Sequence, residues 1–408
     1  MATFTPGTPV ETPDAFIPVE ALPPGKHTFS LVVVDEVGNE SAPALASLEV
    51  TQKAVLVDPK NTTVQKLAAP ADADHDPFGN ELWVSANASV DAPTAGAAAI
   101  AIALPEGRIA GTVQMQAQAG DIAVSRNSDR RVGLVANVGA RSVTLISLAE
   151  RKIIFIFRLK DDVDGVAVTP DGTHGVAAIP ATGQVIVFDL VQLVVLAEIQ
   201  VGKAPSKIRI AQQGRIAFVN CVGDGNIVGI DLKKFTVVGR FLVGGAETSA
   251  PSQFTVTPAG FPVWSANPGS ATASDTLSAT KVHDLLLKFK PQGVAADEGG
   301  KRAFLVGPEA DILAFADAEA AEAKSLRMPA PGGGYKSVAS TREGTCLAVV
   351  HPLKASASFY LGPDPRLRAI VNGLQAPARV VVTDDDAFFC ILDPRGNTVT
   401  LVAIAGLL

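Results

Sequence analysis

The sequence contains little cysteine, little tryptophan or tyrosine, and little charge. Its 408 residues include three Cys, two Trp, two Tyr and three Met, and only 18% of the residues are charged. An odd number of widely spaced cysteines, here Cys221, Cys346 and Cys390, excludes a disulfide framework. Each of them lies in or beside an apolar run, so we expect buried thiols that pack as small apolar side chains.

Excess positive charge is absent as well. The formal net charge is -7 and the pI is near 5.3, and Lys and Arg form no compact cluster. This composition argues against binding to nucleic acid or to an anionic membrane, since both need a basic patch. No apolar run reaches the ~18 residues that a membrane-spanning helix needs.

The N-terminus has neither the positive region nor the apolar core of a secretory signal. We therefore expect a soluble chain that is made in the cytoplasm and is not inserted into a membrane. A final location at a cell surface or in a particle stays open.

Local signatures of catalysis are absent too. The chain has five His and no HExxH, CxxC, GxSxG or phosphate-loop pattern. Zinc, flavin, nucleotide and serine-hydrolase chemistry therefore have no sequence signature here. The sequence predicts a protein that is not an enzyme and has no cofactor.

Short apolar runs that repeat along the chain are abundant instead. Hydrophobic residues make up 47% of the sequence, and one run, rich in Val, Ala, Leu and Phe, recurs after a turn in every unit. The eight copies begin at Leu82, Val132, Gly175, Ile216, Val263, Ala303, Leu347 and Phe388. Their spacing gives a period of about 44 residues, which is typical of four-stranded propeller blades.

The unit from Asp164 to Gly202 shows the repeat most clearly, with four apolar runs separated by turn residues. The sequence therefore predicts an all-β chain with a β-propeller of eight blades. A seven-bladed ring remains the alternative, because the units at 260–292 and 334–375 are weakly marked.

The segments Val135–Ile146 (VANVGARSVTLI) and Gly202–Pro205 (GKAP) carry a family resemblance. Together with the Val-Ala-Val-Thr-Pro-Asp-Gly turn that ends at Gly172, they resemble the YVTN family of β-propeller repeats. The resemblance covers roughly residues 81–408. It implies a propeller but no single activity, because the family includes lactonase-like enzymes, surface-layer proteins and binding scaffolds.

Lactonase-like propellers place His, Glu and Arg around the central channel. The strands that we expect to line the channel offer mainly Val, Ala, Ile and Ser, with Arg209 and Arg379 as the exceptions. The sequence thus gives such a hydrolytic site no support.

Residues 1–52 differ from the rest, and we assign 53–408 to the propeller. The alternating run His27–Val34, a turn at Asp35–Asn39 and a run to Val50 predict a β-hairpin. This stretch resembles the last strands of bacterial immunoglobulin-like and fibronectin-like modules, which usually take about 100 residues. Only a partial immunoglobulin-like segment is present, so the hairpin either packs on its own chain or is completed by another subunit.

The ends of the chain bear on ring closure. The last unit stops after three strands, so an N-terminal strand must complete it. We expect Lys53–Val57 to supply this strand and Thr62–Gln65 to begin the first blade.

The segment Ala71–Asn80 is expected to be an acidic loop. Asp72, Asp74 and Asp76 alternate along it and could converge on a calcium ion, although the spacing falls short of an EF-hand. A solvated acidic turn is the competing interpretation. The run Asp384–Asp386 is interpreted as turn chemistry.

Two further stretches, Gly269–Asp275 and Pro329–Tyr335, are candidate recognition loops. His174 is expected in a solvated turn, and His351 in a loop on a blade face.

Three functional hypotheses follow. The leading one is a non-catalytic propeller scaffold that binds protein partners and joins a larger assembly, such as a surface structure, filament or phage-like particle, through residues 1–52, self-assembly included. The alternatives are a lactonase-like hydrolytic enzyme and a calcium-dependent adhesive module that uses Asp72, Asp74 and Asp76.

Overall fold

The computed structural model describes most of the chain. Its description covers residues 11–12, 25–50, 55–87, 96–242, 253–258, 263–267, 270–275, 280–287, 289–308, 312–317, 323–328 and 333–408. The chain divides into two compact units, Met1–Ala54 and Val55–Leu408. No helix in the described residues has the length and apolar character needed to cross a membrane.

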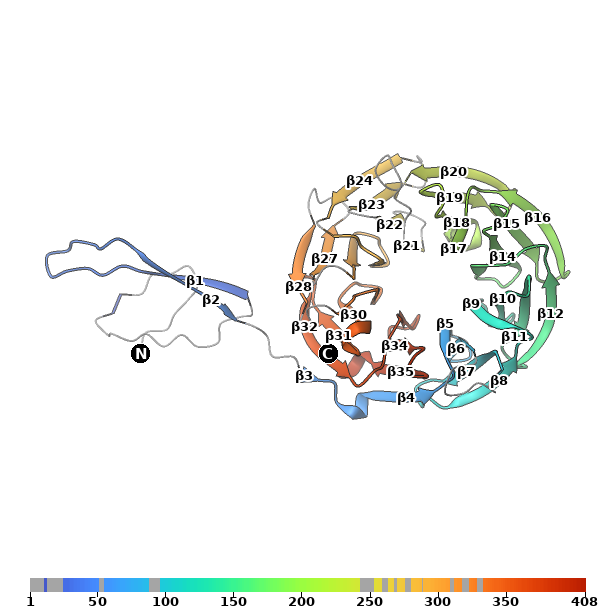
Figure 1. The fold of residues 1–408 in the computed structure, drawn as a ribbon, viewed down its shortest axis with the longest axis horizontal. Helices are drawn as coiled ribbons and strands as arrows, with labels where there is room; N and C mark the ends of the chain where they lie inside the picture. The colour runs from blue at the N-terminus through green and yellow to red at the C-terminus, as the bar shows by residue number, and fades with distance from the viewer. Residues whose placement is uncertain are drawn as a thin grey trace. The chain divides into compact units, whose positions relative to one another are not determined.

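The larger unit is a ring of eight antiparallel sheets around a central channel (Figure 1). In each sheet the first strand lies at the channel and the last at the rim, and consecutive strands pair in chain order. The first four blades consist of β5 (Pro70–Asp76), β6 (Glu81–Ala86), β7 (Ala98–Ala103) and β8 (Ile109–Gln114); β9 (Gln118–Val124), β10 (Val132–Val138), β11 (Ser142–Ser147) and β12 (Lys152–Arg158); β13 (Val166–Val168), β14 (His174–Ile179), β15 (Gln184–Asp189) and β16 (Val194–Gln200); and β17 (Pro205–Ala211), β18 (Ile216–Cys221), β19 (Asn226–Asp231) and β20 (Thr236–Leu242).

The second half of the ring repeats this plan. Its blades consist of β21 (Gln253–Val256), β22 (Val263–Asn267), β23 (Ser270–Asp275) and β24 (Thr280–Leu286); β25 (Gly293–Ala296), β26 (Arg302–Val306), β27 (Ile312–Asp317) and β28 (Lys324–Arg327); β29 (Ser337–Ser340), β30 (Cys346–His351), β31 (Ser356–Leu361) and β32 (Arg366–Asn372), joined by β3 (Val55–Leu56); and β33 (Arg379–Val382), β34 (Phe388–Asp393), β35 (Thr398–Ala403) and β4 (Thr62–Lys66). Short 3-10 turns occur at Pro59–Asn61, Gln212–Gly214, Pro352–Lys354 and Ile404–Gly406.

The predicted all-β fold with eight blades is confirmed. Each of the eight repeated runs is the second strand of one blade, and the weakly marked units at 260–292 and 334–375 both form complete sheets. These second strands are buried on both faces because neighbouring blades pack against them, as β10 and β18 show. This explains their continuous apolar sequences.

Small side chains allow the blades to pack closely. Ala136, Ala177 and Ala217 are fully buried in the second strands, where they lie among Val, Leu and Phe of the adjacent blade. The three cysteines are free and buried, as expected. Burial raises the pKa of the Cys221 and Cys346 thiols to about 12, so both are held in the unreactive protonated form.

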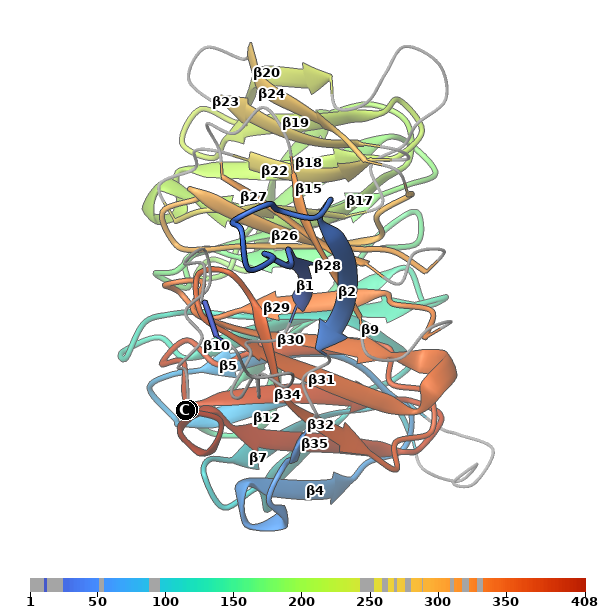
Figure 2. The same ribbon diagram turned by 90° about the vertical axis from the view of Figure 1, so that its left-hand side faces the viewer.

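An N-terminal strand closes the ring, but it is not the one we predicted. β4 pairs antiparallel with β35, with Thr400 opposite Val64, and the two strands lie side by side in Figures 1 and 2. β3, within the predicted closing segment Lys53–Val57, instead pairs in parallel with β32 of the preceding blade. Thr62–Gln65 therefore belongs to the last blade, because β4 leads from the rim of that blade into the innermost strand of the first, as β8 leads into β9.

Two predicted loops are strands. Most of the acidic segment forms β5, the innermost strand of the first blade, and Ser270–Asp275 forms β23 inside the fifth. Neither strand shows the apolar pattern of the other blades, because β5 is acidic and β23 is rich in Ala, Ser and Thr. In the third candidate loop, residues 329–332 lie outside the described residues, and Tyr335 is buried.

The smaller unit contains the predicted hairpin. β1 (Gly25–Leu31) pairs antiparallel with β2 (Ala44–Val50), with Phe29 opposite Ala46. The turn between the strands is held by Asp35, whose carboxylate accepts hydrogen bonds from the Val37 and Asn39 N–H groups at 2.9 and 2.8 Å. Such a carboxylate-capped turn is the chemistry that the sequence of this segment indicates.

Removal of the closing strand should destabilise the ring, whereas removal of the smaller unit should not. We expect a chain lacking Met1–Ala54 to unfold at the temperature of the full chain. A chain lacking Met1–Lys66 loses β4 and leaves β35 with an open edge, so its Tm should fall by on the order of 10 °C. Thermal unfolding followed by circular dichroism measures both. Equal Tm values for the two truncated chains would show that β4 does not close the ring.

Candidate functional site

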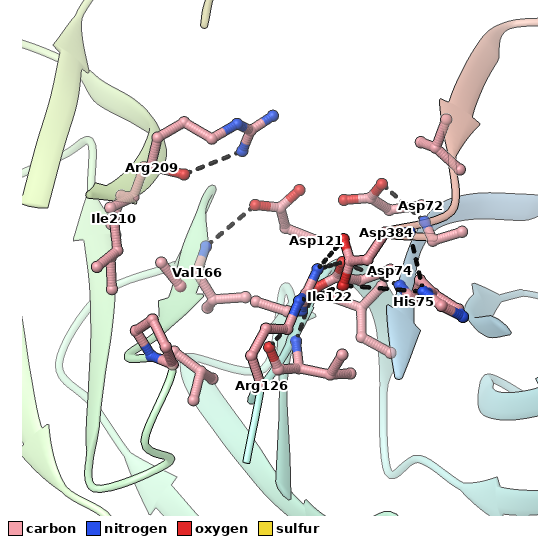
Figure 3. A pocket seen from close by; sticks show the side chains of 18 of the residues that line it. Asp72, Asp74, His75, Asp121, Ile122, Arg126, Val166, Arg209, Ile210 and Asp384 are labelled. Atoms are coloured by element: carbon pink, nitrogen blue, oxygen red, sulfur yellow. Dashed lines mark hydrogen bonds and ion pairs between the residues drawn. The ribbon is translucent and has the colours of Figure 1, made fainter. Parts of the chain in front are cut away.

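Ionisable side chains gather at the central channel, around a cavity of ≈ 670 Å³ (Figure 3). The first strands of several blades contribute to it, because residues of an innermost strand project into the channel. Four acids and three arginines line the cavity, together with one histidine: Asp72, Asp74, Asp121 and Asp384, Arg126, Arg209 and Arg379, and His75. The rest of the lining is mostly apolar and comes largely from β9, β13, β17 and β33.

Two buried carboxyl groups form the centre of this cluster. Arg379 Nη1 lies 2.5 Å from Asp72 Oδ1, and Lys207 Nζ lies 2.5 Å from Asp121 Oδ1. Asp121 Oδ2 also accepts a hydrogen bond from the Val166 N–H at 3.1 Å. Asp121, from the second blade, is thereby bonded to the third and fourth blades.

Asp72 and Asp121 also hydrogen-bond to each other, so the pair titrates as a unit that shares a proton. Burial raises the pKa of Asp72 to about 7, and the neighbouring Asp121 adds to the effect against the opposing charge of Arg379. Burial alone would raise the pKa of Asp121 too, but Lys207 and the hydrogen bond from Asp72 hold it below its usual value. Below neutral pH the proton of the pair therefore resides mainly on Asp72.

A second group of charges centres on Arg126. Its guanidinium donates to both Asp74 carboxylate oxygens, at 2.7 and 3.0 Å, and its Nε lies 2.7 Å from Asp384 Oδ2. Burial alone would raise the pKa of Asp384, but the neighbouring His75 and the charge of Arg126 hold it below the usual range. Arg126 therefore joins the second blade to the first and the eighth.

His75 is not available as a general base. Its Nδ1 accepts a hydrogen bond from the Asp384 N–H at 3.0 Å, which assigns the ring proton to Nε2. Within the part of the chain that the structure describes, Nε2 is buried without a partner. The imidazole thus packs between the first and last blades and accepts a hydrogen bond from the last.

Arg209 differs from the other cations of the channel. Its Nη1 donates to the carbonyl oxygen of Ile208 at 2.9 Å, and no carboxylate among the described residues lies within ion-pair distance of its guanidinium. Figure 3 shows the side chain extending from β17 toward Asp121. It presents unused N–H donors to the cavity.

The three aspartates of the calcium hypothesis lie on β5, each facing a different arginine. Asp72 pairs with Arg379, Asp74 with Arg126, and Asp76 with Arg131 at 2.7 Å. No group of three His, Cys, Asp or Glu side chains within the described residues is arranged to hold a metal ion. Calcium binding stays a prediction, but these carboxylates are not a solvated acidic turn.

The sequence analysis missed the channel cluster. It named Arg209 and Arg379 but placed Asp72 and Asp74 in a loop and Asp384 in a simple turn. Asp384 does follow β33 in a turn, as predicted, yet it also reaches Arg126. Had β5 been assigned to the innermost position of its blade, Asp72 and Asp74 would have been predicted to lie at the channel.

The other two histidines singled out earlier are not in the channel. His351 ends β30 and is buried, with Nε2 2.7 Å from Ser358 Oγ, so the expected loop position was wrong. Burial lowers its pKa to about 4. His174 begins β14, and its Nδ1 lies 2.8 Å from Thr173 Oγ1.

The hairpin of the smaller unit is a second candidate surface. Leu31, Val33 and Val37 are 58%, 61% and 86% exposed. Alternation along β1 puts Phe29 and Leu31 on one face, and the cross-strand register adds Ala44 and Ala46 to it. The exposed Val33 follows β1 by two residues, and we count it with them. We call this set of five residues the hairpin face.

Comparison with known proteins supports the fold and leaves the activity open. No protein-family model and no curated protein matches the chain. Many solved structures resemble it, among them hydrazine synthase of Kuenenia stuttgartiensis, with 16% sequence identity and a TM-score of 0.56 over 83% of this chain and 96% of that one. At this identity the likeness shows the β-propeller fold alone.

Replacement of Asp72 should change how stability depends on pH. The folded protein binds a proton at Asp72 with a pKa of about 7, whereas the unfolded chain binds it with the usual value of 3.8. This contribution is complete below the unfolded value and is lost as the pH rises through about 7. Between pH 5 and pH 8 the wild type should lose on the order of 2 kcal/mol relative to Asp72→Asn, which cannot titrate.

Urea unfolding at a series of pH values measures this difference. The matched control is Asp129→Asn, at an exposed aspartate outside the channel, whose curve should run parallel to that of the wild type. If the stability of Asp72→Asn depended on pH in the same way as that of the wild type, the carboxyl pair would hold no extra proton.

Proposed function

We propose that this protein is a non-catalytic β-propeller scaffold that attaches to a larger assembly through residues 1–52. The observation that supports this most is the hairpin face. A two-stranded sheet is marginal in water, and this one keeps Leu31 and Val33 more than half exposed. A partner that covers the face would stabilise both the hairpin and the complex.

The chemistry of the hairpin indicates the partner. Among the described residues of this unit, β1 and β2 form a two-stranded sheet, and we propose that a strand of the partner adds to its edge. Residues 25–50 contain one Lys and four acidic residues, so negative charge is in excess. The acidic residues are Asp35, Glu36, Glu40 and Glu49. Two copies would repel each other, so we propose a different protein with an apolar sheet surface and basic groups beside it.

In this role the propeller would be the rigid part that presents binding surfaces. Its eight packed blades hold their connecting turns in fixed positions, which suits recognition of a further partner. The protein that covers the hairpin face decides which surface structure, filament or particle the scaffold joins.

Attachment predicts a particle larger than the 42.0 kDa chain. In native extracts of producing cells, the tagged full chain should sediment in such a particle. The double variant Leu31→Lys/Val33→Lys should sediment as the free chain, because two charges cannot be buried against an apolar partner. The control Ser30→Lys/Ser47→Lys changes the opposite face of the hairpin by the same charge and should behave as the wild type.

Two results would contradict the proposal. One is a wild-type chain that sediments as a monomer in the native extract, and the other is a particle that survives the Leu31→Lys/Val33→Lys change. If the purified wild type alone forms the large particle, the partner is a second copy of this chain, and the assignment of a different protein is wrong.

A lactonase-like hydrolytic enzyme is the second candidate, and one observation favours it. His75, Arg126 and Arg379 converge on the cavity beside a carboxyl pair, as expected for a hydrolytic propeller. Against it, both arginines are already paired with aspartates and the His75 Nδ1 is already an acceptor. The groups that hydrolysis needs are thus engaged with one another.

The scaffold proposal predicts that γ-butyrolactone and p-nitrophenyl acetate are hydrolysed no faster with the protein than in buffer. Proton release, followed with a pH indicator, and absorbance measure the two reactions. Hydrolysis that Asp72→Asn abolishes but Asp129→Asn preserves would support the enzyme instead.

A further inference from the structure

The lining of the cavity in the central channel is chemically mixed. Its charged residues come from β5, β9, β17 and β33 and from the turns that follow them. Its apolar residues include Val166, Val168 and Ile210, and Figure 3 shows Arg209 on the same side of the cavity as Val166 and Ile210. The cavity volume of ≈ 670 Å³ lies in the range of small-molecule sites. A ligand that fits must therefore combine a polar end with an apolar body.

The charges at this end of the channel do not cancel. Four cations reach this end of the channel, namely Arg126, Lys207, Arg209 and Arg379, and so do four acids, namely Asp72, Asp74, Asp121 and Asp384. The charge of the four cations is balanced only when all four acids are ionised. With the shared proton on Asp72, three carboxylates face four cations, and one positive charge is left without a counterion.

Arg209 is the cation of this cluster that has no acidic partner among the described residues. Arg126 is bound to Asp74 and Asp384, Lys207 to Asp121, and Arg379 to the carboxyl group of Asp72. The Arg209 guanidinium donates only to a backbone carbonyl group, so its other N–H groups are directed at the cavity without an anionic acceptor among the described residues. A planar guanidinium with free donors matches the two oxygens of a carboxylate.

We propose that the central channel binds a small organic monocarboxylate, whose carboxylate pairs with Arg209 and whose apolar body lies against Val166, Val168 and Ile210. The Asp72/Asp121 pair lines the same cavity as Arg209. It can donate a hydrogen bond to a hydroxyl group of the ligand or accept one from it. This site is independent of the hairpin face and of the attachment proposed above.

Binding should depend on pH as well as on Arg209. Ionisation of Asp72 removes the excess positive charge that the ligand neutralises. The groups that face Asp72 are Arg379 from β33, Asp121 from β9 and Lys207 from β17. Affinity of the wild type should therefore fall as the pH rises through about 7.

Ligand-observed NMR titration with benzoate tests the site, with neutral benzamide as the matched probe and inorganic phosphate as a second anion. The full-length wild type should bind benzoate saturably and more tightly than benzamide or phosphate. Arg209→Gln should weaken benzoate binding by about tenfold to a hundredfold, the loss expected for a charge-assisted hydrogen bond. Arg209→Lys keeps the charge without the fork and should fall between the two.

Two controls make the result specific. Arg215→Gln alters an exposed arginine of the same blade and should leave benzoate binding unchanged. Asp72→Asn should remove the loss of affinity between pH 6 and pH 8, and thermal unfolding verifies that each variant is folded.

Equal benzoate affinity in the wild type and folded Arg209→Gln would overturn the proposal. So would binding of phosphate but not benzoate, or no binding of benzoate at all.

Discussion

Closure of the ring is the constraint on which the rest of this structure depends. A radial array of sheets is stable only when the last blade meets the first, and here the two ends of the chain share one sheet through β4 and β35. The same junction is reinforced at the channel, where Asp72 pairs with Arg379. Backbone hydrogen bonds at the rim and the contact between Arg379 and the Asp72 carboxyl group at the centre thus hold the ends together.

Buried charges explain why the channel is ordered rather than a simple hole. A carboxylate moved out of water is stable only with a partner, and Asp72, Asp74 and Asp121 each meet a cation that belongs to another blade. The partners must therefore be in register around the ring before any of these acids can be buried. The same contacts between buried acids and cations of other blades thus fix the order of the blades and make the cavity polar.

The sequence predicted the blades well because their second strands are buried on both faces and read as uninterrupted apolar runs. It predicted the hairpin for a similar reason, since Asp35 and Asn39 mark its turn. It could not predict β5, whose Asp-rich sequence contradicts strand propensity and becomes stable only through arginines more than 50 residues away. The candidate site was missed with it, because no local motif reports which strands meet at the channel.

Pairing across the junction also sets an order of events during synthesis. The innermost strand of the first blade carries Asp72 and His75, whereas their partners Arg379 and Asp384 lie far along the chain, with 309 positions between His75 and Asp384. Domains generally fold as units. β4 and β5 therefore cannot complete their contacts until the strands of the eighth blade have been made.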